Sequence, residues 1–79
     1  MNYLAHFDTQ PDIFGGETVI RGTRVTIRTL LASLAEGDPI ADILADFPTV
    51  SADDVYAVIA FAAASAAEDL PVPPMPKVA

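Results

Sequence analysis

The sequence predicts a small α+β domain, mainly α, in which an N-terminal β-hairpin packs on three helices. Three features support this fold class: an alternating stretch over 17–27 that follows a Gly pair, apolar residues at helical spacing over 27–47, and a helix-opening pattern at Ser51. The chain has 79 residues, enough for one domain with a modest core. We therefore expect one domain over 1–69, followed by a Pro-rich tail over 70–79.

The expected hairpin has strands over Glu17–Ile20 and Arg24–Ile27, joined by a turn at Arg21-Gly22-Thr23. Gly22 stands where a tight connection needs a positive φ, which a residue without Cβ adopts at little cost. Ahead of the hairpin, apolar residues nearly alternate over Met1–Pro11, which predicts an extended arm.

A first helix is expected from Thr26 to Glu36. Its apolar stripe consists of Ile27, Leu30, Leu31 and Leu34. The Thr26 hydroxyl can accept a hydrogen bond from a free N–H of the first turn, and Gly37 occupies the position just after the helix where a left-handed residue is favoured.

A second helix follows at once, with Asp38 as its N-cap and Pro39 as its first helical residue. Its stripe consists of Ile40, Ile43, Leu44 and Phe47. Pro48 ends it. Two short helices joined by so tight a turn form a compact pair, as in a helix-turn-helix.

Ser51 opens the third helix, and Asp54 three residues later completes a variant of the capping box. The expected inner face consists of Val55, Val58, Ile59 and Ala62. Beyond it, the run AFAAASAA over 60–67 carries no charge on any face. Alanine tolerates water and favours helix, but we prefer a self-association or partner surface for an apolar run of this length. The predicted dimer interface consists of Phe61, Ala63, Ala64 and Ala67.

The charge is unevenly distributed. The chain carries 4 basic and 11 acidic residues and a net charge of −7, which makes a lone subunit a poor DNA binder and fits a basic protein partner better. Three of the basic residues, Arg21, Arg24 and Arg28, lie close together in the hairpin and helix start. We predict that they bind a partner, although Arg28 has an alternative, a pair with a nearby carboxylate such as Glu17.

The tail over 70–79 reads LPVPPMPKVA and favours polyproline II over helix. Two interpretations stay open. It is either a disordered end or a strap that binds a partner through Leu70, Val72 and Met75.

Catalytic chemistry is not expected. Cysteine is absent and His6 is the only histidine, so the usual nucleophile–base pairs and histidine–thiolate metal sites are missing. We predict no enzyme activity, no cofactor and no metal, and a surface or packing role for His6. The sequence shows no signal-peptide pattern and its longest apolar run is too short for a bilayer, so a cytoplasmic location is expected.

Three stretches carry a family resemblance: GGETVIRGTRVTI, LLASLAEGDPIADILADFP and SADDVYAVIAFAA. Over about Asp8 to Ala67 they resemble the domain of unknown function 433 family, with its GTR hairpin, its helix ending in Gly and its helix ending in Phe-Pro. That family is similar to helix-turn-helix domains. Its members are commonly encoded beside PIN-like nuclease toxins and are interpreted as VapB-like antitoxins.

The resemblance implies an antitoxin of a type II toxin–antitoxin pair, homodimeric, that neutralises a PIN-like ribonuclease. In that role the arginines would reach the metal-binding carboxylates of the toxin. The chain departs from the family pattern at Glu17-Thr18, where Lys-Pro is frequent, and in a third helix poor in basic residues. DNA is therefore expected to bind only weakly or through the toxin complex. Two alternatives remain, a transcriptional regulator acting through the helix-turn-helix and a structural dimerisation module.

Overall fold

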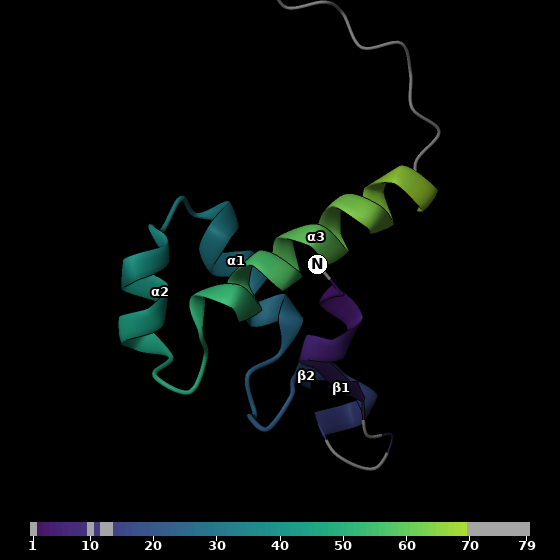
Figure 1. Cartoon of the computed structure of the whole chain (residues 1–79), viewed down its shortest axis with the longest axis horizontal. Helices are drawn as coiled ribbons and strands as arrows, with labels where there is room; N and C mark the ends of the chain where they lie inside the picture. Colours follow the sequence, from purple (N-terminus) through teal and green to yellow (C-terminus); the bar gives the residue numbers. More distant parts are fainter. Residues whose placement is uncertain (1, 10, 12–13, 70–79) are drawn as a thin grey trace, which may run out of the picture.

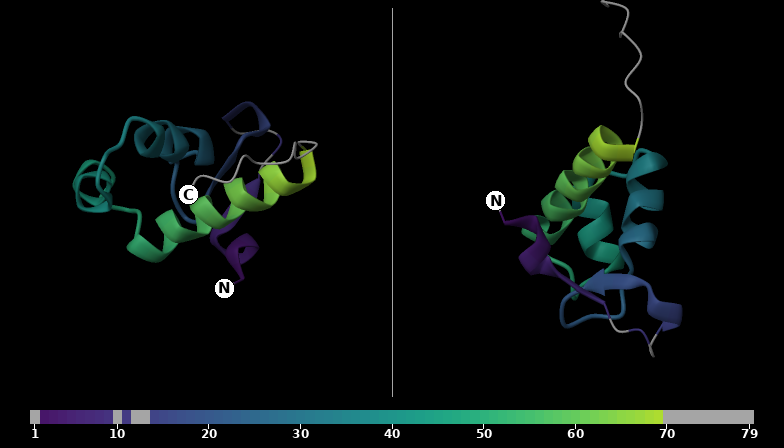
Figure 2. Two further views of the ribbon diagram at one scale, coloured as in Figure 1. Left: turned by 90° about the horizontal axis from the view of Figure 1, so that it is seen from above. Right: turned by 90° about the vertical axis from the view of Figure 1, so that its right-hand side faces the viewer.

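The fold is mainly α with a small antiparallel sheet, as predicted. The computed structural model describes residues 2–9, 11 and 14–69. Its elements in chain order are η1 (Tyr3–His6), β1 (Phe7–Thr9), η2 (Phe14–Gly16), β2 (Thr18–Ile20), α1 (Ile27–Ala35), α2 (Ile40–Asp46) and α3 (Ala52–Asp69). Figures 1 and 2 show α1 and α2 beside the first half of α3, with the two strands at one end of the helices.

None of the helices in the described part of the chain combines the length and the hydropathy needed to cross a membrane.

The sheet pairs different segments from those predicted. Strand β1 lies antiparallel to β2, with Phe7 opposite Ile20. The predicted second strand over 24–27 is wrong, because only the single bridge between Val19 and Thr26 forms there. The chain turns too soon for a strand, since Thr26 already caps α1.

The N-terminal arm supplies the missing strand. It is extended only over β1, because η1 coils the residues before it into a 3-10 turn. Gly22 has φ 78° in the turn after β2, as predicted. The arm therefore supplies the strand that pairs with β2, in the place that the local sequence pattern assigned to residues 24–27.

Helix α1 begins and ends as predicted. The Thr26 hydroxyl accepts a hydrogen bond from the Thr29 N–H at 3.1 Å. At the other end Gly37 has φ 87°. There the Asp38 N–H donates to the Ser33 carbonyl at 3.1 Å, and the Gly37 N–H donates to the Leu34 carbonyl at 3.0 Å. These two bonds form a Schellman motif, which satisfies carbonyls that the helix leaves without partners.

Helix α2 begins one residue later than predicted. Pro39, at φ −63° and ψ 151°, is the N-cap, and its carbonyl accepts from the N–H groups of Asp42 and Ile43. Asp38 is therefore not the N-cap, because its backbone still belongs to the Schellman motif of α1. The predicted end holds, with Phe47 as C-cap ahead of Pro48.

Helix α3 opens with the predicted capping box. The Ser51 N–H donates to Asp54 Oδ2 at 2.9 Å, and the Asp54 N–H donates to Ser51 Oγ at 3.1 Å. Each side chain thus satisfies a backbone donor of the other residue.

The core forms where the first half of α3 meets α1, α2 and the sheet. Its buried residues are Phe7, Ile20, Ile27, Leu30, Ile43, Val50, Val55, Ala57 and Val58. The inner face of α3 is rotated from the predicted one. Ile59 is 41% exposed, whereas Ala57 is fully buried, because η1 packs against α3 on a side that the sequence pattern left open.

Candidate partner-binding site

The fixed positive charge of the described residues lies at the junction of the sheet and α1. Arg21 lies in the turn after β2, Arg24 in the stretch leading to α1, and Arg28 in the first turn of α1. All three side chains are exposed. The predicted cluster is therefore a surface feature, available to a partner.

Arg28 has an intramolecular partner, the carboxylate of Glu17, and this pairing confirms the alternative that the sequence left open. The side chain of Arg28 is 81% exposed and that of Glu17 is 33% exposed. A cation in the first turn of a helix faces the positive end of the helix dipole. Glu17 offsets that unfavourable placement, while the exposed side of the guanidinium remains open to solvent.

Arg21 and Arg24 differ in what they contact. The Arg21 side chain donates from Nη2 to the Phe7 carbonyl at 3.3 Å, which ties the turn to β1. The side chain of Arg24 is exposed. No side-chain hydrogen bond or ion pair joins Arg24 to another described residue. Arg24 is thus the arginine with the fewest contacts to other described side chains or carbonyls.

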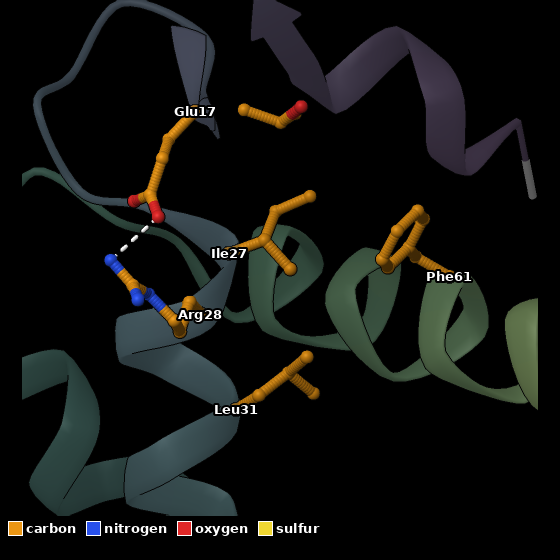
Figure 3. A pocket seen from close by; sticks show the side chains of 6 residues that line it. Glu17, Ile27, Arg28, Leu31 and Phe61 are labelled. Atoms are coloured by element: carbon orange, nitrogen blue, oxygen red, sulfur yellow. Dashed lines mark ion pairs between the residues drawn. The ribbon is translucent and has the colours of Figure 1, made fainter. Parts of the chain in front are cut away.

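A groove opens beside Arg28. Its volume is about 280 Å³, and its lining consists of Glu17, Thr18, Ile27, Arg28, Leu31 and Phe61. Figure 3 shows the apolar side chains of Ile27, Leu31 and Phe61 around one space, with the ion pair at its edge. The groove therefore combines an apolar floor with a charged rim.

His6 has a structural contact that the sequence analysis did not foresee. Its Nδ1 lies 2.8 Å from Asp54 Oδ1, and the two residues are 48 positions apart. Burial alone would raise the pKa of Asp54, but hydrogen bonds from His6 and Ser51 outweigh it and lower that pKa. No local pattern signals this pair, because it depends on η1 packing against α3.

The predicted dimer residues divide into two sets. Ala63 and Ala67 are exposed, whereas Phe61 and Ala64 are half-buried. The Phe61 ring makes an edge-to-face contact with Phe7, with centroids 5.8 Å apart. The predicted tail contacts Leu70, Val72 and Met75 lie outside the described residues.

The exposed face of α3 carries two larger side chains that the sequence analysis did not assign to an interface. Tyr56 is 50% exposed and Ile59 is 41% exposed. At about 100° per residue, both share one face with Ala63 and Ala67.

Within the described residues, no group of three or more His, Asp or Glu side chains is placed to hold a metal ion.

Taken together, the fold and the site define a small helical domain with a groove that has an apolar floor and an ion pair at its rim. The chain belongs to the family described as protein of unknown function DUF433, whose model matches residues 8–62. This match confirms the family resemblance.

A relative of this chain is the uncharacterized protein y4eO of Sinorhizobium fredii. The two are 35% identical over 57 residues, which cover 72% of this chain and 26% of that protein. The chain thus matches only about a quarter of its relative's length. No solved structure matches the chain significantly.

Proposed function

We propose that this protein is a cytoplasmic antitoxin that binds a PIN-like ribonuclease and blocks its active site, and that it acts without catalytic chemistry of its own. The observation that carries the proposal is the arginine cluster over 21–28 in a chain of net charge −7. The interpretation of related sequences as VapB-like antitoxins supports the same role.

The proposed contact is between a guanidinium and the metal-binding carboxylates of the nuclease. A guanidinium matches a carboxylate with two parallel hydrogen bonds and occupies the space that the metal ion needs. Arg24 suits this contact best, because it is exposed and binds no other described side chain. Arg21 would first have to share or release the Phe7 carbonyl, and Arg28 would have to share or release the Glu17 carboxylate.

The helix arrangement also raises the alternative of direct DNA binding. A recognition helix directs its N-terminal residues to base edges and is flanked by phosphates. The first turn of α3 instead carries Asp53 and Asp54, and its sequence contains no Lys or Arg. These acidic residues favour binding of a nuclease toxin over binding of DNA by the isolated chain.

Calorimetric titration with the PIN-like nuclease proposed as its partner tests this function. Arg24→Ala should weaken binding about 30-fold or more, which corresponds to roughly 2 kcal/mol for loss of one member of a desolvated charge pair. Arg24→Lys should restore only part of the affinity, because the fork geometry is lost. Glu36→Ala, an exposed change at the far end of α1, is the control.

Two results would contradict the proposal. Unchanged affinity in Arg21→Ala, Arg24→Ala and Arg28→Ala alike, with normal melting curves, would remove the cluster from the interface. Tight and sequence-specific retention of the upstream DNA by the isolated protein in a gel shift would favour the transcriptional regulator.

We also propose that two copies pair through the exposed face of α3, formed by Tyr56, Ile59, Ala63 and Ala67. This face carries no charge, so two strongly acidic chains can approach there with the least repulsion, and its alanines allow the helices to pack closely. Phe61 is left out of this interface, because its ring contacts Phe7 within the same subunit.

Sedimentation equilibrium tests the pairing. The wild type should contain dimer at about tens of micromolar, and Ala63→Glu should shift it to monomer because an unpaired charge would be buried. Ala41→Glu adds the same charge at an exposed position of α2 and should leave the dimer intact. A wild type that stays monomeric at this concentration would refute the pairing.

A further inference from the structure

We infer that the groove beside Arg28 binds a partner segment that presents an apolar side chain next to a carboxylate. The inference rests on the proposed function, since it specifies the partner chemistry recognised at the same surface. It adds an anchoring pocket to the arginine contacts. Arg28 would bind a carboxylate at this pocket, whereas Arg24 lies outside the groove lining.

The size and lining of the groove fit a single side chain. Its volume of about 280 Å³ is at the lower end of the roughly 300–1,000 Å³ typical of small-molecule pockets. Ile27, Leu31 and Phe61 supply an apolar floor from two helices, α1 and α3 (Figure 3). An aliphatic or aromatic side chain of a partner would be removed from water there, which is the main source of affinity in such anchors.

The rim of the groove already holds a carboxylate. Glu17 pairs with the Arg28 guanidinium at the edge of the apolar floor, and Arg28 remains largely exposed. Glu17 thus shows where a carboxylate is bound relative to the floor. A partner's Asp or Glu would share the guanidinium fork with Glu17 or displace it.

Charge complementarity distinguishes this occupant from two others. A second copy is expected on the face of α3 that contains Ala63, and Phe61 points about 160° away from that residue around the helix. The tail over 70–79 contains no Asp or Glu, and its charged side chain, Lys77, would be repelled by Arg28. A partner segment with an apolar side chain next to an Asp or Glu would place the apolar group on the floor and the carboxylate beside Arg28.

Nitrogen–proton correlation NMR of the full chain tests the inference, with 4-phenylbutyrate as the probe. This molecule combines an apolar ring with a carboxylate, and 4-phenylbutan-1-ol is its uncharged counterpart. Shifts should concentrate on Thr18, Ile27, Arg28, Leu31 and Phe61. The acid should bind about threefold more tightly than the alcohol, as expected for one charge pair about 6 Å apart in water.

Four charge variants separate the effect of the groove rim from that of the net charge. Glu17→Gln should raise the affinity for the acid above that of the wild type, because it removes the competing carboxylate. Glu36→Gln changes the net charge equally at a distant exposed site and should leave the affinity unchanged. Arg28→Gln should abolish the preference for the acid, whereas Arg24→Gln, outside the groove lining, should preserve it.

Several outcomes would overturn the inference. These are shifts scattered over the surface, equal affinity for acid and alcohol, or a Glu17→Gln variant with weaker binding. Groove shifts that depend on protein concentration without probe would assign the site to a second copy. Groove shifts produced by Met75→Ser without probe would assign it to the tail.

The test is independent of the nuclease, so the two proposals can fail separately. Leu31→Gln keeps a good helix former in α1 while making the floor polar. If it binds the nuclease like the wild type while Arg24→Ala does not, the antitoxin role stands and the groove is not its anchor. If the probe binds as expected but the nuclease does not, the groove stands and the antitoxin role fails.

Discussion

The two halves of α3 differ in their surroundings. In the first half Val55, Ala57 and Val58 are fully buried against α1, α2 and the N-terminal arm. Over 59–67 no residue is buried, and Ile59 is 41% exposed. Tertiary packing therefore holds the first half, whereas the second half depends mainly on the helix propensity of alanine.

The contrast shows that one helix can combine two environments. Its first half supplies buried side chains to the core, and its second half leaves alanines open to solvent. Each of the following changes either removes this contrast or measures it more finely.

The largest effect is expected from truncating matched β-branched residues in the two halves. Val55→Ala should lower the free energy of unfolding by about 2 kcal/mol, because it removes two buried methyl groups and leaves a cavity. Ile59→Ala should change it by about 0.5 kcal/mol or less, since its site is partly open to water. Urea denaturation of both variants measures the difference, and equal losses would show that the two halves are packed alike.

A smaller effect is expected at the start of the helix. Asp54→Asn should cost about 1 kcal/mol at neutral pH, because the capping box and the His6 contact are weakened. Since the pKa of Asp54 is lowered in the folded state, its contribution is complete above its unfolded pKa of about 3.9 and is lost as the pH falls through the lower folded value.

Denaturation at a series of pH values checks this contribution. The wild type should lose stability below about pH 4, and Asp54→Asn should lose less over the same range. Asp53→Asn, at an exposed neighbouring position, provides the control. A wild type and an Asp54→Asn variant with parallel pH profiles would contradict the assigned role.

The smallest effect concerns the aromatic contact of the second half. The rings of Phe7 and Phe61 meet at 83°, with centroids 5.8 Å apart. A double-mutant cycle with Phe7→Leu and Phe61→Leu should give a coupling of about 0.5–1 kcal/mol. Additive effects in thermal or urea unfolding would mean that Phe61 contributes by burial alone.

The sequence predicted the features that depend on neighbouring residues. Thr26, Gly37 and the Ser51–Asp54 box act through partners within a few positions, so their chemistry can be recognised locally. The start of α2 was misplaced by one residue, because Asp38 fits the N-cap pattern but its backbone N–H belongs to the Schellman motif of α1 and Pro39 is the N-cap.

Features that depend on distant residues were not predictable in the same way. The segment over 18–20 had two short extended neighbours, and alternation alone did not show that it pairs with 7–9 rather than with 24–27. The burial of Ala57 in place of Ile59 has a similar origin, because the arm covers one flank of α3. The groove likewise needs Phe61 to meet Leu31 across two helices, which spacing in one helix cannot reveal.

The pair between His6 and Asp54 also has a consequence for protein synthesis. The arm is synthesised before α3, and the carboxylate that binds His6 is made 48 residues after His6 itself. At about 5–20 residues per second, this interval lasts roughly 2–10 seconds. Until β2 and α3 have been made, the ring of Phe7 therefore lacks the residues that cover it in the folded domain.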